Sequence, residues 1–376
     1  MRYYLIAGEA SGDLHGSNLM KGLLRNDPQA EFRFWGGDLM AAVGGRDRLA
    51  KHYRDASFFG IGEIVRRLPT VLSQIGECKR DIAAYAPDVL ILIDYPGFNF
   101  RMAKFAHERG IRVFYYISPK VWAWKEHRVE RIRRYVDKLF IIFPFEVAYF
   151  AGKGIDAVYE GNPLMDAVAE RCAAMPPREE FLQANGLGGR PVIALLAGSR
   201  RSNNLPFMTA LAELMPEYDF VLAAVPWLGT ELYAELLAGS RIVCLYDKTY
   251  EVVRYADAAV VTSGTATLET ALIGTPEVVC YRTDALTVWA GRRLLKIPYI
   301  SLVNLVMDRE IVKELIQQDM TPERAAAELR TILPGGAQRE RMLADYGSLR
   351  ERIGGPGASE RVAARMVELL RGGGDS

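Results

Sequence analysis

Two short apolar segments that each end in a glycine turn constrain the fold of this chain of 376 residues most strongly. Residues Tyr3–Ala7 run directly into Gly8-Glu9-Ala10-Ser11-Gly12-Asp13, and in the second half Val192–Ala197 runs into Gly198-Ser199-Arg200. A helical pattern follows in both places. A buried strand, a glycine turn and a helix are how a nucleotide-type α/β domain begins. The sequence therefore predicts two Rossmann-like domains.

Further apolar runs recur along the chain, with helical patterns between most of them. Runs that are apolar throughout indicate strands buried on both faces, as in parallel sheets. Strands that alternate with helices indicate βαβ units, so the fold class is α/β. The predicted strands are Tyr3–Ala7, Val89–Ile93, Val113–Ile117, Leu139–Phe143, Val192–Leu196, Phe220–Ala224, Ile242–Leu245, Ala258–Thr262 and Glu277–Tyr281.

Helix breakers divide the chain near Gly161-Asn162-Pro163. We therefore expect an N-terminal domain over residues 1–165 and a C-terminal domain over residues 166–355. An amphipathic pattern near the end predicts a last helix at about residues 356–372.

Composition and charge exclude several classes of protein. The apolar fraction of 50% and the net charge of +1 are those of an ordinary globular protein without general attraction to nucleic acid. Residues 1–160 carry 24 Lys and Arg against 19 Asp and Glu, so this half is the better candidate for an anionic substrate or membrane face. No P-loop motif and no cluster of metal ligands is present. No apolar run is long enough to span a membrane, and no signal peptide is visible.

Two loops that follow predicted strands carry the first candidate site residues. Gly8, Glu9, Ser11 and Gly12 are compatible either with a ligand that approaches the backbone closely or with a tight turn alone. Asp94 ends an apolar strand and is followed by Pro96-Gly97-Phe98-Asn99. A carboxylate there is suited to removing a proton from a sugar hydroxyl, or it caps the next helix.

A third loop combines aromatic and basic residues. Two tryptophans after a strand suit either an apolar wall for a sugar or lipid substrate or the packing of a core. The basic residues that follow suit a phosphate or an anionic lipid, or the solvated face of a helix. The candidates in this loop are Ser118, Lys120, Trp122, Trp124 and Arg128.

The second half carries two patterns suited to a diphosphate. Arg200 follows the glycine turn of Gly198 and Ser199, where a guanidinium and helix N–H groups would bind phosphate oxygens. The string Ser263-Gly264-Thr265-Ala266-Thr267-Leu268-Glu269 ends a strand and starts a helix, which brings N–H groups and hydroxyls together. Glu269 would accept hydrogen bonds from ribose hydroxyls. An ion pair and a capping box are the alternatives.

A helical apolar pattern beside two arginines is compatible with a membrane surface. A helix that covers the sheet is the default interpretation, and shallow insertion into a membrane is the alternative. Pro69 interrupts the pattern. The residues concerned are Ile61, Ile64, Val65, Arg66, Arg67, Leu68 and Leu72.

The order and spacing of these strings resemble the lipid-A-disaccharide synthase family from Gly8 to about Leu315. Ser118-Pro119-Lys120-Val121-Trp122-Ala123-Trp124 is the most specific string. Pro144-Phe145-Glu146 and Ser301-Leu302-Val303-Asn304-Leu305 also match. Four strings depart from the family pattern. Gly97 stands where aspartate is common, and no carboxylate follows Arg200 before Glu213. Asn162 stands where histidine is frequent, and Val303 stands where proline is common.

The resemblance implies a GT-B fold, in which two Rossmann-like domains have parallel sheets facing across a cleft and the last helix returns to the N-terminal domain. It implies transfer of 2,3-diacylglucosamine from UDP-2,3-diacylglucosamine to 2,3-diacylglucosamine 1-phosphate (lipid X), with inversion and without a metal or another cofactor. It also implies association with the cytoplasmic face of the inner membrane of a Gram-negative-type bacterium, possible oligomers, and no nucleic-acid partner.

The family resemblance also assigns roles to residues. Asp94 matches a proposed general base, and Arg200 and Asn304 match residues associated with UDP. We expect Gly198, Ser199 and the Ser263–Glu269 string beside UDP, and the loops of the first half, including Asn99, beside the acceptor. Two alternatives stay open: another UDP-sugar enzyme on this fold, such as a UDP-N-acetylglucosamine 2-epimerase, or a non-catalytic UDP-sugar-binding protein.

Overall fold

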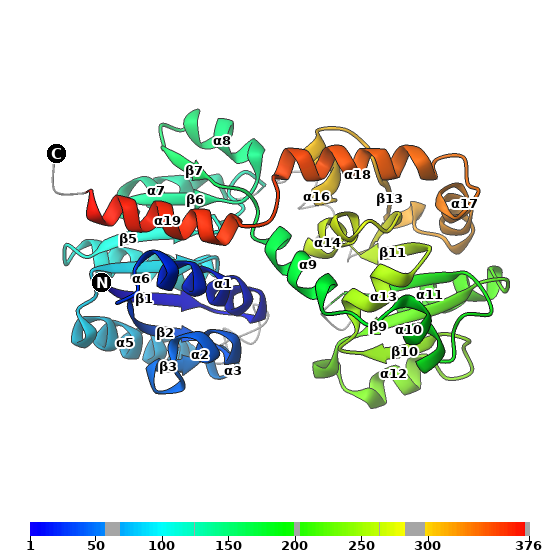
Figure 1. Cartoon of the computed structure of the whole chain (residues 1–376), viewed down its shortest axis with the longest axis horizontal. Coiled ribbons are helices and arrows are strands. Elements are labelled where there is room, and N and C mark those ends of the chain that lie inside the picture. The colour runs from blue at the N-terminus through cyan, green and yellow to red at the C-terminus, as the bar shows by residue number, and fades with distance from the viewer. Residues whose placement is uncertain (57–67, 124, 199–203, 263, 283–297, 373–376) are drawn as a thin grey trace. The chain divides into compact units, whose positions relative to one another are not determined.

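The computed structural model describes residues 1–56, 68–123, 125–198, 204–262, 264–282 and 298–372 (Figure 1). The chain forms two compact units. Unit 1 comprises Met1–Ala167 and Gly354–Ser376, and unit 2 comprises Val168–Ile353. Helix α9 (Leu164–Ala173) begins in the first and ends in the second.

Unit 1 contains, within its described residues, a seven-stranded parallel sheet in the order β3-β2-β1-β4-β5-β6-β7. Its strands are β1 Arg2–Ala7, β2 Glu31–Gly36, β3 Leu49–His52, β4 Val89–Ile93, β5 Arg112–Tyr116, β6 Lys138–Ile141 and β7 Ala157–Tyr159. Its α-helices are α1 Ala10–Asn26, α2 Asp38–Gly44, α3 Tyr53–Ala56, α5 Leu68–Tyr85, α6 Pro96–His107, α7 Val129–Tyr135, α8 Pro144–Ala151 and α19 Ala358–Arg371, with 3-10 turns η1 Arg46–Arg48 and η2 Glu126–Arg128.

Both faces of this sheet are buried, which is why its central strands are apolar throughout. Tyr4 and Ile6 of β1 pack into one cluster with residues of α5, α6 and α7. Tyr3 and Leu5 of the same strand pack into the other cluster, which includes residues of α1, α2 and α19. Alternate side chains of one strand therefore complete two separate cores.

The last helix belongs to unit 1 because it packs against α1. A Cβ on Gly22 of α1 would lie only 2.8 Å from the Cβ of Ala363 of α19, so glycine permits this close approach. Val362 and Met366 are fully buried in the same core. Asp166 accepts hydrogen bonds from the N–H groups of Gly357 and Ser359 at the start of α19. These contacts return the C-terminal helix to the first unit.

Unit 2 contains, within its described residues, a six-stranded parallel sheet in the order β10-β9-β8-β11-β12-β13. Its strands are β8 Val192–Leu196, β9 Asp219–Ala224, β10 Val243–Tyr246, β11 Ala258–Thr262, β12 Glu277–Tyr281 and β13 Lys313–Ile316. Its α-helices are α10 Arg178–Ala184, α11 Leu205–Leu214, α12 Thr230–Leu236, α13 Thr249–Tyr255, α14 Thr265–Ile273, α16 Leu302–Met307, α17 Pro322–Ile332 and α18 Arg339–Ile353, with 3-10 turns η3 Pro226–Leu228 and η4 Gln317–Asp319.

Each sheet has a point at which its strand order reverses. In unit 1 the reversal lies between β1 and β4, and in unit 2 it lies between β8 and β11. Loops at the carboxyl ends of such neighbouring strands diverge and leave room for a ligand. These four strands end at Ala7, Ile93, Leu196 and Thr262, just before the predicted site strings. The fold thus places predicted site strings at both reversal points.

The predicted fold class is confirmed, and polar residues, or in β7 a length of only three residues, explain why four strands were not predicted from the sequence. Strands β3, β7 and β13 are edge strands and are largely half-buried, and none of them has a long apolar run. Strand β2 is interrupted by Glu31 and by Arg33, whose guanidinium pairs with Asp81 at 2.9 Å. A criterion based on apolar runs therefore misses short strands and strands in which polar residues interrupt the run, although it found the half-buried edge strand β10, whose residues are apolar.

Candidate functional site

Asp94 stands on a strained backbone at the end of β4. The φ angles of Asp94 and Tyr95 are 43° and 45°, a left-handed conformation that is uncommon for residues other than glycine. The carbonyl oxygen of Asp94 accepts hydrogen bonds from the Tyr115 hydroxyl at 2.6 Å and from the Asn99 amide at 2.8 Å. Strain of this kind persists where surrounding contacts determine the backbone, and it gathers at functional sites.

The surroundings of Asp94 weaken its acidity. Burial, and then the nearby carboxylate of Glu9, raise the pKa of Asp94 to about 6. The Lys120 ammonium and the backbone N–H of Tyr95 act in the opposite direction on this pKa. A carboxylate with this pKa is mostly ionised at neutral pH and is a better proton acceptor than an ordinary aspartate.

The loop between β1 and α1 packs directly against the Asp94 loop. A Cβ on Gly8 would lie 2.3 Å from Cγ of Tyr95, so no larger residue fits there without moving that ring. Ser11 donates a hydrogen bond to Glu9 at 2.6 Å. A Cβ on Gly12 would stand 3.2 Å from that of Ala7. The structure therefore brings the predicted residues of the first loop together with Asp94 and Asn99.

Asp13, the last residue of the first string, has a structural role. Its buried carboxylate accepts hydrogen bonds from the N–H groups of Gly37, Leu39 and Met40 at 2.7–3.0 Å. These groups lie at the start of α2, where helix N–H groups lack partners within the helix. Asp13 thus fixes the path of the chain after β2. No local sequence signal pairs it with α2, because 24 residues separate Asp13 from Gly37.

Ser118 and Trp122 are held by a buried glutamate that sequence analysis had placed in a separate string. Glu146 accepts hydrogen bonds from the Ser118 hydroxyl at 2.6 Å and from the Trp122 indole N–H at 3.0 Å. It also accepts from the N–H groups of Ile142 and Phe143. Burial raises the pKa of Glu146, and these hydrogen bonds oppose that rise. The Ser-Pro-x-x-Trp and Pro-Phe-Glu strings therefore form one network.

The remaining residues of that loop lie in different surroundings. Lys120 is exposed and acts electrostatically on Asp94. Arg128 lines a pocket between α6 and α7. Trp124 lies outside the described residues. Among the predicted acceptor residues, Lys120 therefore interacts electrostatically with Asp94. Ser118 and Trp122 instead form hydrogen bonds with Glu146.

In unit 2 the two glycine turns predicted to bind a diphosphate lie side by side. Gly198 has a φ of 93°, and a Cβ on it would stand 3.0 Å from Oγ1 of Thr262. Gly264, with a φ of 131°, precedes α14, and the Thr267 hydroxyl donates to its carbonyl oxygen at 2.9 Å. Thr265 is exposed in the first turn of α14. Ser199, Arg200 and Ser263 lie outside the described residues.

Two predicted donor residues have partners inside the protein. Glu269 accepts a hydrogen bond from the Tyr250 hydroxyl at 2.8 Å, and burial raises the pKa of Glu269. Asn304 is fully buried: its amide N–H₂ donates to Val312 and Glu314, and its oxygen accepts from the N–H groups of Ile311 and Val312. Each side chain therefore supports the local structure.

Most of the predicted membrane-surface residues fall outside the described part of the chain. This holds for Ile61, Ile64, Val65, Arg66 and Arg67. Leu68 begins α5, with Pro69 in its first turn, where proline is tolerated. Leu72 of this helix is 58% exposed. No described helix has the length and apolar character needed to cross a membrane.

Comparison with known proteins shows to which family this chain belongs. The model of the lipid-A-disaccharide synthetase family matches residues 3–360. Relatives include lipid-A-disaccharide synthases of Geobacter metallireducens, 39% identical, and Myxococcus xanthus, 38% identical. Both alignments cover 98% of this chain and 97% of the relative.

Similar solved structures support the fold at low sequence identity. The UDP-GlcNAc 2-epimerase of Neisseria meningitidis has a TM-score of 0.69 at 12% identity, covering 98% of this chain and 100% of the other. A structure described as the glycotransferase of kitacinnamycin has a TM-score of 0.62 at 15% identity, covering 98% of each chain. These likenesses establish the GT-B fold and do not favour an epimerase. By its family match and its full-length relatives, the chain belongs to the lipid-A-disaccharide synthetase family of glycosyltransferases.

Proposed function

We propose that the enzyme transfers 2,3-diacylglucosamine from UDP-2,3-diacylglucosamine to 2,3-diacylglucosamine 1-phosphate. The 6-hydroxyl oxygen of the acceptor forms a bond to the anomeric carbon of the donor as the bond from that carbon to UDP breaks. The hydroxyl proton passes to a base, and UDP leaves with the bonding electron pair. Direct displacement inverts the anomeric carbon and yields a β-1,6-linked disaccharide 1-phosphate.

The observation that carries this proposal is the state of Asp94. It stands at the strand-order reversal of unit 1, and its pKa of about 6 leaves it ionised but basic at neutral pH. Hydrogen bonds from Asn99 and Tyr115 to its backbone carbonyl oxygen fix the backbone from which the carboxylate extends, and a general base needs a fixed position relative to the hydroxyl. We assign Asp94 as the general base.

We assign the diphosphate of the donor to the loops at the reversal of unit 2. Gly198 and Gly264 add no side chain of their own at this edge, and the start of α14 offers N–H groups. Arg200, Ser199, Ser263 and Thr265 supply a cation and hydroxyls there. Positive charge and N–H groups stabilise UDP as it departs. Glu269 and Asn304 act by holding α14 and the 311–314 segment in place.

We assign the acceptor to the loops around Asp94, with Gly8, Glu9, Ser11, Gly12 and Lys120 near its sugar. The network of Ser118, Trp122 and Glu146 shapes the neighbouring wall. Both substrates carry acyl chains, so the enzyme works at a membrane surface. We assign the start of α5, where Leu72 is exposed, to contact with lipid at the cytoplasmic face of the inner membrane.

The experiment is a product assay with the purified enzyme, the donor and the acceptor, with and without a chelator. We expect the disaccharide 1-phosphate and UDP in both reactions. Asp94→Asn should bind UDP normally and lower kcat by about 100-fold or more, because base catalysis contributes on this scale. The control is Asp88→Asn, the same change at the exposed opposite end of β4. Near-normal turnover by Asp94→Asn would remove Asp94 from the role of base.

A further inference from the structure

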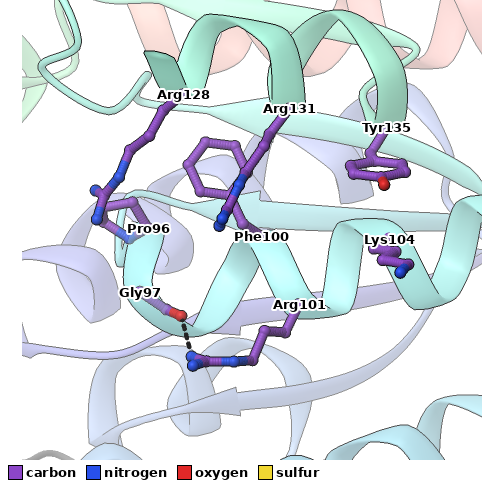
Figure 2. A pocket seen from close by; sticks show the side chains of 8 residues that line it. All are labelled: Pro96, Gly97, Phe100, Arg101, Lys104, Arg128, Arg131 and Tyr135. Carbon is purple, nitrogen blue, oxygen red and sulfur yellow. Dashed lines mark hydrogen bonds between the residues drawn. The ribbon is translucent and has the colours of Figure 1, made fainter. Parts of the chain in front are cut away.

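A pocket of about 490 Å³ lies between α6 and α7 of unit 1 (Figure 2). It begins at Pro96 and Gly97, in the first turn of α6, and continues along that helix. Phe100 and Tyr135 contribute aromatic walls. Four basic side chains complete the lining: Arg101, Lys104, Arg128 and Arg131.

The basic residues come from two facing elements. Arg128 and Arg131 are three residues apart, which places them on one side of the η2–α7 segment. In Figure 2 both extend from this segment toward the start of α6. Arg101 and Lys104 are also three residues apart and come from α6. Two pairs of cations therefore share one pocket.

The described lining of the pocket is rich in positive charge. The lining residues include no carboxylate. Lys104 has Glu108 at 3.7 Å, and Arg101 donates to the carbonyl oxygen of Gly97 at 2.6 Å, which leaves its charge in place. Burial and then the charge of Arg131 lower the pKa of Arg128. An arrangement in which arginines repel one another is suited to an anion that would relieve the repulsion.

The basic lining of the pocket and its position after Asp94 favour a phosphate monoester as the bound anion. A phosphate monoester carries close to two negative charges and several acceptor oxygens, which arginines bind through forked hydrogen bonds. The pocket starts two residues after Asp94. In a glucosamine 1-phosphate, the carbon that bears the phosphate and the carbon that bears the 6-hydroxymethyl group flank the same ring oxygen, so the ring holds the phosphate and the 6-hydroxyl at neighbouring positions. Because the pocket begins at the helix that follows Asp94, one acceptor molecule with its 6-hydroxyl at Asp94 is suited to direct its phosphate into this pocket.

We propose that the α6–α7 pocket binds the 1-phosphate of the acceptor, with Arg128, Arg131, Arg101 and Lys104 as its ligands. This inference rests on the proposed function, because it takes the acceptor from it. The pocket selects an acceptor that carries a phosphate monoester and aligns the 6-hydroxyl with Asp94. A free sugar without phosphate lacks this anchor.

The test compares the phosphorylated acceptor with 2,3-diacylglucosamine that lacks the phosphate. Arg131→Met and Lys104→Met should each raise KM for the phosphorylated acceptor, Arg131→Met by about tenfold or more, with little change in kcat. Neither variant should change KM for the unphosphorylated acceptor. Both residues are exposed, so the fold should tolerate the changes. The matched control is Arg134→Met, an exposed arginine of α7 outside the pocket lining, which should leave both KM values unchanged.

Two further experiments distinguish the phosphate pocket from a failure of the proposed reaction and from binding of membrane headgroups. Glucosamine 1-phosphate should bind the wild type and not Arg131→Met in calorimetry, while UDP binds both. If the wild type bound this probe through Arg131 but formed no disaccharide, the proposed reaction would fail and the phosphate pocket would stand. Unchanged acceptor KM in Arg131→Met, with normal wild-type turnover, would overturn the inference. If Arg131→Met lost binding to phosphatidylglycerol vesicles while its acceptor KM stayed unchanged, the pocket would bind membrane headgroups. That result would also overturn the inference.

Discussion

The ring of Tyr95 lies against Gly8, with its Cγ 2.3 Å from where a Cβ on that glycine would stand. This contact joins the loop after β1 to the loop after β4. Tyr95 follows Asp94 directly and shares its left-handed backbone. The position of the carboxylate therefore depends on a residue 86 positions away that has no side chain of its own.

Gly8→Ala should lower both the activity of the enzyme and the free energy of unfolding. The new methyl group forces the Tyr95 ring to move, and overpacking of this kind costs about 1–3 kcal/mol. Because Asp94 is adjacent, we expect kcat to fall by at least an order of magnitude while UDP affinity stays normal. The control is Gly347→Ala in α18, where a Cβ meets nothing within 4 Å. Equal turnover in the two variants would show that the contact between Gly8 and Tyr95 does not matter for catalysis.

The pH profile should report Asp94. A base must be ionised, so kcat/KM should fall about tenfold per pH unit below the pKa of Asp94, which is about 6. Glu9 raises this pKa, so Glu9→Gln should move the acid limb to lower pH. Lys120 lowers it, so Lys120→Met should move the limb to higher pH. Profiles of the three proteins from pH 4.5 to 8 test the assignment, which would be lost if both variants shifted the limb in the same direction.

Glu146→Gln should destabilise unit 1. The carboxylate accepts four hydrogen bonds, two of them from the N–H groups of Ile142 and Phe143. A glutamine amide would place its N–H₂ against some of these donors, and each buried group left unsatisfied costs about 1–3 kcal/mol. We expect a clear fall in Tm by calorimetry. Glu31→Gln, at the exposed start of β2, is the control and should change Tm little; the same Tm for both variants would contradict a structural role for Glu146.

Glu277→Gln should stabilise unit 2 at neutral pH. Glu277 is fully buried, neither of its oxygens has a hydrogen-bond partner among the described residues, and burial raises its pKa well above the ordinary value. The folded state therefore keeps a proton that the unfolded state releases near pH 4.5. Stability of the wild type should fall relative to the variant as pH rises above 4.5, by up to about 1.4 kcal/mol per pH unit until the folded pKa is reached.

The measurement is denaturant unfolding of both proteins at pH 4.5, 6 and 7.5. The difference in the free energy of unfolding between Glu277→Gln and wild type should be small at pH 4.5 and grow in favour of the variant. A difference that is constant with pH would mean that Glu277 has the same proton occupancy in the folded and unfolded states.

Local sequence was sufficient for the parts of the site that depend on one strand and its following turn. The apolar run Val89–Ile93 predicts a buried strand, and an aspartate directly after such a strand in a parallel sheet stands at its carboxyl edge. The same reasoning placed Gly198 and Gly264 at one edge of the second sheet. These predictions needed no knowledge of contacts between distant residues.

The sequence by itself determined the two α/β units and the strands at their centres, because burial on both faces of a sheet leaves a continuous apolar run. Only the tertiary structure decided what the polar residues of the motifs do. Glu9 acts on Asp94, Asp13 caps α2, and Glu146 joins Ser118 to Trp122. The pairing of these polar groups is set by strands that lie together in the sheet, and hydrogen bonds and charges act over a few ångströms whatever the separation along the chain.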